Sequence, residues 1–447
     1  MPERKVKTGS ERRWRTYLRR LVLGIVLIAL LGVVGDQAYS AWKLQHLPPP
    51  AVPQPAPVVS KPSTGPGSVS QIVSVSEFTP GAVAAEAKQN YGADITSSPY
   101  TVTRILFTYI STGVDNQPIT VYARAYIPNI KNAPVIAMAP GTTGVGDECA
   151  ASLEQPSIHD WANYESHMMA YASQGYAGVI TDYEGMRDPS SIHHYMIGTL
   201  EGQAVLDSIR ALKTLPQAHG DIDSNEVFAS GYSQGGHSAF WADTINASYA
   251  PDVHLAGIIG WAPVMDVGES LRDITHGSTL TWFGPYVLVS YADYYKVSFP
   301  LNIILLPQWQ PNLTADVLNH CIDTDISFWG TNPAKVYTPQ FLAGLKSGNL
   351  PADQFGPLQA EMQANQVGSE QTTTPKLINQ GQTDNVVLPS QQQTAMARLC
   401  ANSRGPVELK AFTKTTHYTV MHNSFRDTLA WMSQIIHHSA APLSTCS

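Results

Sequence analysis

Charged residues are scarce in this chain. Asp, Glu, Lys and Arg make up 14% of its 447 residues, whereas about 25% is usual in globular domains. Hydrophobic residues account for 43% of the sequence, which is enough for a large buried core in one enlarged domain or in two or three smaller ones. The low charge, together with 20 Tyr and 9 Trp, suits a protein that contacts apolar material.

Cysteine is also rare, and the motifs built on it are missing. The four cysteines are Cys149, Cys321, Cys400 and Cys446, and they form no C-x-x-C pair and no Cys/His spacing typical of a zinc site. The sequence contains no metal-ligand cluster and no phosphate-binding glycine loop, so we expect neither a metal nor a cofactor. Four cysteines are consistent with two disulfides in an oxidising compartment, although the sequence leaves three pairings open.

Positive charge is concentrated at the N-terminus. Residues 1–20 contain eight Arg or Lys and two Glu, a net charge of +6, whereas the whole chain carries −8, so the other residues together carry −14. An acidic body of this kind argues against nucleic acid as a partner.

An uncharged apolar stretch, residues 21–35, directly follows the basic segment. This order is typical of a secretory signal peptide or a signal anchor, so residues 1–45 predict export, with a possible membrane tether through residues 21–35. Ala38-Tyr39-Ser40 offers a cleavage site, and cleavage and retention both stay open. Residues 46–69 are rich in proline and are expected to form an extended linker. In either case we expect an extracytoplasmic protein, secreted or anchored.

Strand and helix patterns alternate along the rest of the chain, which favours an α/β fold with a mostly parallel central sheet. Strands are predicted over 101–110, 119–127, 134–141, 177–185, 226–233, 255–263, 375–381 and 407–413, and helices over 158–174, 198–213, 234–242 and 420–437. Residues 264–374 lack this alternation and are too long for a loop in a compact domain. We therefore predict a core over 70–263 and 375–447, with a helical cap or lid over 264–374.

Gly231-Tyr232-Ser233-Gln234-Gly235 matches the G-x-S-x-G pattern of the nucleophile elbow in the α/β-hydrolase fold. The serine of an elbow lies on a strained turn between a strand and a helix, where larger side chains two positions away would collide with the backbone. An apolar strand precedes the motif and a helix of small residues follows it, so Ser233 is the predicted nucleophile.

A serine hydroxyl needs a histidine to remove its proton and a carboxylate to orient that histidine. In this fold the acid and then the histidine follow the serine along the chain. Asp384 follows the strand 375–381, and His417 follows the strand 407–413, so both lie where parallel sheets place their catalytic groups. Asp266 is the second choice for the acid. The rival histidines His237, His422, His437 and His438 occupy helical positions and fit less well.

The oxyanion formed during attack on an ester carbonyl needs preset backbone N–H donors. One is expected from Gln234, the residue after the nucleophile. The other is expected from the loop after the strand 134–141, where Thr142, Thr143 and Gly144 are the candidates.

Several segments together resemble the secretory lipase family, which includes yeast lipase A enzymes and actinobacterial lipases. They are APGTTGVGDECAAS (139–152), ITDYEGM (180–186), YMIGTLEGQAVLDSIRA (195–211), GYSQGGHSA (231–239) and GQTDNVV (381–387). The resemblance covers nearly all of residues 80–437. It implies an α/β-hydrolase fold, a triad on Ser233, Asp384 and His417, and a cap inserted before the acid. It also implies the disulfides Cys149–Cys321 and Cys400–Cys446.

The sequence therefore predicts an exported serine hydrolase that cleaves carboxylic esters through an acyl-enzyme. The aromatic and aliphatic content of residues 264–374 favours fatty-acyl esters or triacylglycerol as the lipid substrate. The same machinery could instead transfer acyl groups to an alcohol, or cleave a peptide or a polyester. An inactive module that binds lipid is the alternative outside the enzymes.

Overall fold

The computed structural model describes residues 65–446 except 96, 219 and 220. The predicted signal peptide or anchor over 1–45 lies outside the described residues, as does the linker over 46–69 up to residue 64. Among the helices of the described part, none combines the length and the apolar character needed to cross a bilayer.

Within the described residues, nine strands form one sheet in the order β1-β2-β3-β5-β4-β6-β7-β8-β9. From β5 to β9 all neighbouring strands are parallel, whereas β1, β2 and β3 pair antiparallel with one another and β3 pairs antiparallel with β5. The mostly parallel sheet is confirmed. The strands are β1 (Val69–Phe78), β2 (Val102–Thr112), β3 (Pro118–Pro128), β4 (Ala133–Ala139), β5 (Ala177–Thr181), β6 (Ile222–Tyr232), β7 (Leu255–Trp261), β8 (Lys376–Gly381) and β9 (Val407–Phe412).

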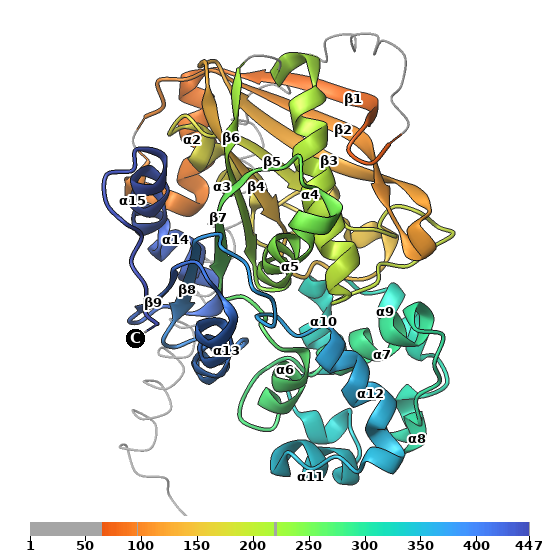
Figure 1. Ribbon diagram of the computed structural model, residues 1–447. Coiled ribbons are helices and arrows are strands. Elements are labelled where there is room, and N and C mark those ends of the chain that lie inside the picture. Colours follow the sequence, from red (N-terminus) through yellow and green to blue (C-terminus); the bar gives the residue numbers. More distant parts are fainter. Residues whose placement is uncertain (1–64, 96, 219–220, 447) are drawn as a thin grey trace, which may run out of the picture. The chain divides into compact units, whose positions relative to one another are not determined.

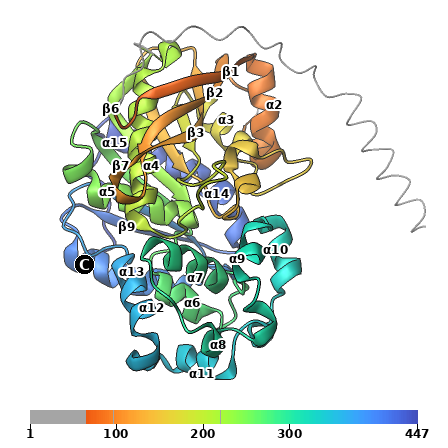
Figure 2. The same ribbon diagram turned by 90° about the vertical axis from the view of Figure 1, so that its right-hand side faces the viewer.

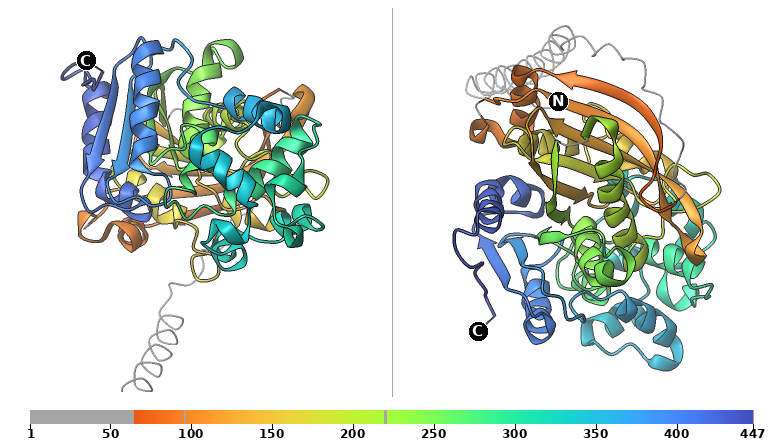
Figure 3. Two further views of the ribbon diagram at one scale, coloured as in Figure 1. Left: turned by 90° about the horizontal axis from the view of Figure 1, so that it is seen from below. Right: turned by 45° about the horizontal axis from the view of Figure 1, so that its top comes forward.

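Helices cover both faces of this sheet (Figure 1). One face packs against α4 (Gly198–Thr214), α5 (Gln234–Tyr249) and α13 (Pro389–Asn402), whose apolar side chains join one buried cluster. The other face packs against α2 (Pro80–Tyr91), α3 (Tyr164–Ala172), α14 (Val420–Asn423) and α15 (Phe425–Ile436). Figure 3 shows the blue helices α13 and α15 on opposite sides of strands β8 and β9. Because both faces are covered, the strands β4, β5 and β7 consist almost entirely of apolar residues.

All the elements between β7 and β8 are helical, and they gather at one end of the sheet (Figure 2). They enclose a third apolar cluster, which is rich in aromatic side chains. This arrangement supports the predicted cap over 264–374, although the domain boundaries stay a prediction. The helices are α6 (Val267–Asp273), α7 (Phe283–Tyr294), α8 (Leu301–Ile304), α9 (Leu313–Leu318), α10 (Ile322–Trp329), α11 (Pro339–Ser347) and α12 (Ala352–Ala364).

The helix predicted over 158–174 is wrong in its first third. Helix α3 begins only at Tyr164, after the N-cap Asn163. The carboxylate of Glu154 accepts the four backbone N–H groups of Trp161 to Tyr164, so this segment wraps around a buried side chain instead of continuing the helix. Strand β1 and helices α2 and α13 were not predicted. The other predicted strands and helices are present within about four residues of their bounds, except that α5 ends at Tyr249 and not at residue 242.

Two disulfides are present, Cys149–Cys321 and Cys400–Cys446, which confirms the pairing that the family resemblance implies. Cys321 is the N-cap of α10 in the cap region, and Cys149 lies in the loop after β4. The first disulfide therefore joins the core to the cap. The second joins α13 to the C-terminal segment.

Candidate active site

Ser233 lies at the sharp turn between β6 and α5. Its backbone has φ 56° and ψ −115°, a conformation that is costly for any residue except glycine and that tends to persist at functional sites. The neighbouring glycines explain how the turn closes. A Cβ on Gly231 would overlap the carbonyl oxygen of Gly235, and a Cβ on Gly235 would overlap that of Ala139. The predicted elbow is thus present in the form that its sequence pattern requires.

The predicted acid and base are in direct contact. His417 Nδ1 lies 2.8 Å from Asp384 Oδ2, and both side chains are buried. The other carboxylate oxygen of Asp384 accepts the backbone N–H groups of Val386 and Val387 at 2.8 and 3.0 Å, which fixes the carboxylate after β8. With Nδ1 donating to Asp384, His417 keeps Nε2 as a proton acceptor.

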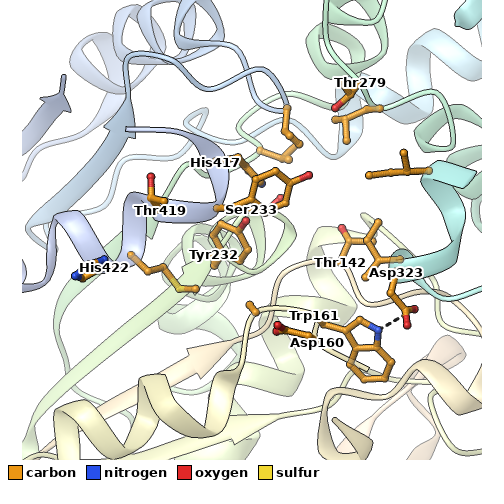
Figure 4. Close-up of a pocket in the computed structure, with 18 of the residues that line it drawn as sticks. Thr142, Asp160, Trp161, Tyr232, Ser233, Thr279, Asp323, His417, Thr419 and His422 are labelled. Carbon is orange, nitrogen blue, oxygen red and sulfur yellow. Dashed lines mark hydrogen bonds between the residues drawn. The ribbon is translucent and has the colours of Figure 1, made fainter. Parts of the chain in front are cut away.

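Ser233 and His417 line the same cavity (Figure 4). Within the described residues, the serine hydroxyl is not hydrogen-bonded to the histidine. Such contacts are often loose without substrate and tighten when the carbonyl enters.

The rival residues have other partners. Asp266 caps α6 by accepting the N–H of Glu269, and it forms an ion pair with Arg398 at 3.3 Å. His422 lines the polar edge of the cavity, and its Nε2 is 3.7 Å from a carboxylate oxygen of Asp94. His437 and His438 follow the end of α15. His237 is buried and bonded to Glu201 and to the carbonyl of Asn365.

The oxyanion candidates are not equivalent in the structure. Gln234 is the first residue of α5, so its N–H has no acceptor within the helix and lies at the positive end of the helix dipole. Of the three loop residues, Thr142 lines the cavity together with Ser233, whereas Thr143 is buried with its carbonyl bonded to Ile322. Gly144 packs directly against the Cys149 sulfur. The geometry therefore favours Thr142 over Thr143 and Gly144.

The cavity has a volume of about 490 Å³ and lies between core and cap. The cap contributes an apolar wall with Leu280, Trp282, Phe283, Ile322 and Ile326, and the core adds apolar side chains such as Trp161, Val386 and Met421. A more polar edge is formed by core side chains, among them Gln89, Asn90, Asp160, Thr419 and His422. Figure 4 shows Thr419 and His422 on one side of Ser233 and Thr142 and Asp323 on another. Ser233 and His417 thus face a mainly apolar space with one polar edge.

Sequence reasoning missed a buried polar network directly behind the elbow. Glu201, on α4, lies within hydrogen-bonding distance of Gln234, His237 and Ser238, all in the first two turns of α5. Burial raises the pKa of Glu201, but the hydrogen bond and charge of His237 outweigh burial and hold the pKa below its ordinary value. The sequence signal for this network is the carboxylate of Glu201 on the buried face of a helix, because carboxylates are rarely buried without partners.

The strand order, the turn at Ser233, and an acid and a histidine following β8 and β9 define the class of the fold: it is an α/β-hydrolase fold. The sequence profile of the family described as "Secretory lipase" matches residues 162–441. The chain belongs to the secretory lipase family.

Curated relatives are similar over shorter stretches. Lipase A of Moesziomyces aphidis is 34% identical over 111 residues, which cover 25% of this chain and 20% of that protein. Secreted triacylglycerol lipase LIP4 of Malassezia globosa is 29% identical over 163 residues, which cover 35% of this chain and 32% of that protein. The matched stretches thus span between a fifth and a third of the length of these relatives.

Solved structures share the fold at low sequence identity. The rice cell wall degrading esterase LipA from Xanthomonas oryzae aligns with a TM-score of 0.64 and 20% identity, covering 83% of this chain and 97% of that one. Candida antarctica lipase A in its closed state aligns with a TM-score of 0.61 and 18% identity, covering 86% of each chain. At these identities the likeness bears on the fold alone.

Proposed function

We propose that the protein is an exported serine hydrolase that cleaves carboxylic esters. One observation carries the proposal: Ser233 is held in a strained elbow and faces a cavity that it shares with His417, whose other nitrogen is bonded to Asp384. Such a backbone conformation is unfavourable by about 1–3 kcal/mol, and residues held in it cluster at active sites.

In the proposed reaction, the Ser233 oxygen bonds to the ester carbonyl carbon while His417 Nε2 accepts the serine proton. The carbonyl oxygen becomes an oxyanion, which the N–H groups of Gln234 and Thr142 stabilise. When the bond to the alcohol breaks, His417 returns the proton to the departing oxygen and an acyl-enzyme remains. Water then attacks the acyl carbon with the same base, which releases the acid and the free serine.

Fatty-acyl esters, including triacylglycerol, are the proposed substrates. The apolar cap wall suits an aliphatic acyl chain, because burying each methylene contributes about 0.8 kcal/mol. Two relatives, one named lipase A and one named secreted triacylglycerol lipase, agree with this substrate class. We also propose an extracytoplasmic location, with residues 21–35 as either a cleaved signal or a membrane tether.

The test is hydrolysis of p-nitrophenyl esters from acetate to palmitate by the purified chain and by its Ser233→Ala variant. We expect release of p-nitrophenol by the wild type, at least about a thousandfold slower release by the variant, and covalent labelling of Ser233 by a fluorophosphonate. A folded wild-type protein that neither hydrolyses any of these esters nor reacts with the fluorophosphonate would contradict the proposal and favour an inactive lipid-binding module.

An acyltransferase shares the acyl-enzyme and differs only in the acceptor. Adding a primary alcohol to the ester assay separates the two functions. A hydrolase releases mostly free acid in water with dilute alcohol, whereas a transferase forms mostly the new ester. Peptide and polyester substrates tested in parallel distinguish the other two alternatives.

A further inference from the structure

One carboxylate, Glu201, lies at the centre of the groups that surround the candidate oxyanion site. It is in the first turn of α4, and the whole residue is 1% exposed. Its Oε1 accepts the Gln234 side-chain amide at 2.7 Å and the Met196 backbone N–H at 2.9 Å. Its Oε2 lies 2.7 Å from His237 Nδ1. The carboxylate thus links α4, and the loop just before it at Met196, to the first two turns of α5.

The first connection fixes Gln234. The Gln234 amide nitrogen has two hydrogens, and it lies 2.7 Å from both Glu201 Oε1 and His193 Nε2. His193 accepts there because its other ring nitrogen faces the carbonyl of Glu184 at 3.2 Å, which can only accept. Burial also lowers the pKa of His193, which favours the neutral ring. With its side chain held at two points, Gln234 keeps its backbone N–H in place at the start of α5.

The second connection leads to Thr142. Met196 has a φ of 60°, a backbone conformation that is unfavourable for a residue with a Cβ and needs support from its surroundings. The hydrogen bond from its N–H to Glu201 supplies that support. The preceding residue, Tyr195, places its hydroxyl 2.9 Å from Thr142 Oγ1. The position of Thr142 thus depends on a loop that Glu201 holds in shape.

The third connection fixes the first turn of α5 from the other side. His237 is four residues after Ser233, and its Nε2 is 2.8 Å from the carbonyl of Asn365, which follows α12. A carbonyl only accepts, so the ring donates at Nε2, and it donates to Glu201 as well when both nitrogens carry a proton. Glu201 therefore has a histidine partner on the same helix as the nucleophile.

We propose that Glu201 is a positioning residue that holds both N–H donors of the oxyanion site, Gln234 directly and Thr142 through Met196 and Tyr195. This inference rests on the proposed ester hydrolysis, and it adds a residue that touches neither the substrate nor the reacting atoms. Its removal affects the stage at which negative charge develops on the carbonyl oxygen, and it leaves binding of the uncharged ester nearly unchanged.

The test compares the full chain with Glu201→Gln, an isosteric change that removes the charge and turns one accepting oxygen into a donor. For p-nitrophenyl butyrate we expect kcat to fall about 10- to 100-fold, less than the loss of a whole oxyanion donor, with KM within about threefold. The matched control is Asp207→Asn. Asp207 is a buried carboxylate on the same helix, but its partners are Ser111, Tyr249 and Arg210, away from the elbow. It should lower the Tm without lowering kcat.

A trifluoromethyl ketone gives a readout that a purely structural role would not change. Its carbonyl adds the Ser233 oxygen, the serine proton passes to His417, and the resulting oxyanion occupies the site of the substrate oxyanion. We expect its Ki to rise by the same factor as kcat falls in Glu201→Gln. An unchanged Ki and a kcat within threefold of wild type, with a lower Tm alone, would overturn the proposal.

Tyr195→Phe tests the proposed link to Thr142 if Glu201→Gln does not fold. This change removes only the hydroxyl that reaches Thr142, and we expect a several-fold fall in kcat with a parallel rise in the Ki of the ketone. If Tyr195→Phe has wild-type kcat and Ki, the proposed link is wrong. If the wild type itself shows no hydrolysis and no fluorophosphonate labelling, the proposed function fails instead, so the two failures are distinguishable.

Discussion

At the scale of single residues, the elbow depends on two glycines that allow backbone segments to approach one another. Gly231 and Gly235 lie two positions either side of Ser233, and each faces a carbonyl oxygen at a distance that leaves no room for a Cβ. The cost of a side chain at these positions is therefore steric and local. It should affect stability and activity together, because the same turn carries the nucleophile.

We predict that Gly235→Ala destabilises the protein by about 1–3 kcal/mol or more, as overpacking does in other cores, and abolishes most ester hydrolysis. Urea unfolding and p-nitrophenyl butyrate hydrolysis measure the two effects. The control is Gly81→Ala, in the first turn of α2, where a Cβ would meet nothing within 4 Å. That variant should be neutral or more stable by up to about 1 kcal/mol. Equal stability of the two variants would contradict the steric explanation.

The contact between Asp384 and His417 decides which nitrogen of the histidine carries the proton. Asp384→Asn can keep the hydrogen bonds from Val386 and Val387 through its amide oxygen, so the fold should persist. An amide donor facing Nδ1 would stabilise the wrong tautomer, and we expect kcat to fall about 10³- to 10⁴-fold. Asp266→Asn, at the second-choice acid, should retain wild-type kcat. A large loss in Asp266→Asn with little loss in Asp384→Asn would reverse the assignment.

At the scale of elements, histidines of the core donate to acceptors on several parts of the cap. His159 Nδ1 lies 2.8 Å from Asp323 on α10, and His194 Nε2 lies 2.9 Å from Asp293 on α7. His237 Nε2 likewise lies 2.8 Å from the carbonyl oxygen of Asn365, the residue after α12. The attachment of the cap to the core therefore includes hydrogen bonds from histidine side chains.

His194 carries the clearest pH dependence, because its other ring nitrogen faces Glu184 at 2.8 Å. Burial lowers the pKa of His194, but hydrogen bonds to Glu184 and Asp293 and their charges outweigh burial, so the pKa lies above its ordinary value. A folded-state pKa above the unfolded value, about 6.5, adds stability at lower pH. This contribution is complete below that value and is lost as the pH rises through the folded-state pKa.

We therefore expect the stability difference between wild type and His194→Gln to be larger at about pH 6 than at about pH 9, measured by urea unfolding at both pH values. Lys296 also contacts Asp293 and should be left unchanged. His276→Gln, at an exposed position just after α6, serves as the control and should show no such pH dependence. A difference for His194→Gln that is the same at both pH values would refute a charged His194 at the cap.

The Cys149–Cys321 disulfide joins the cap to the loop that carries Thr142, and Gly144 packs against its sulfur. Replacing both cysteines by alanine should cost about 2–5 kcal/mol and should also lower kcat, because that loop loses its attachment to α10. Replacing Cys400 and Cys446 by alanine should cost stability with kcat unchanged, since that disulfide joins α13 to the C-terminal segment. Equal kcat in the two double variants would show that the first disulfide has no influence on the site.

The features that sequence reasoning identified are those encoded by neighbouring residues. Ser233, Asp384 and His417 each follow a strand within about five residues, and the order of these strands along the chain is a property of the fold. Strand β1 was missed because its residues do not alternate regularly between buried and exposed. Helix α13 was missed because its first half, Ser390 to Thr394, is an unbroken polar run.

Contacts between distant residues could not be predicted in this way. Glu201 meets Gln234 only after α4 and α5 have packed side by side on the sheet. The start of α3 depends on Glu154, a carboxylate that lies outside the helix it interrupts. In both cases a buried carboxyl group accepts hydrogen bonds from several donors, and a hydrophobic pattern does not reveal which donors will reach it.

At the scale of the whole molecule, the cavity belongs to neither region alone. The core contributes Ser233 and His417, and the cap contributes a large apolar part of the wall. The chemistry and the substrate preference are therefore carried by different parts of the chain. Changes in the cap wall should alter which esters react and should leave the reaction itself intact.

Leu280 offers a direct test of this separation, because its side chain lines the cavity from the cap. Leu280→Trp fills part of the volume of about 490 Å³, so long acyl chains lose contacts that short ones never made. Excluding two methylenes, at about 0.8 kcal/mol each, should lower kcat/KM for p-nitrophenyl palmitate about tenfold, whereas the value for butyrate should change by less than about threefold. Leu443→Trp makes the same change at a position that is 65% exposed and should leave both values unchanged. An equal fall in kcat/KM for both esters in Leu280→Trp would contradict this separation of cap and core. The substitution would then have disturbed the catalytic groups themselves.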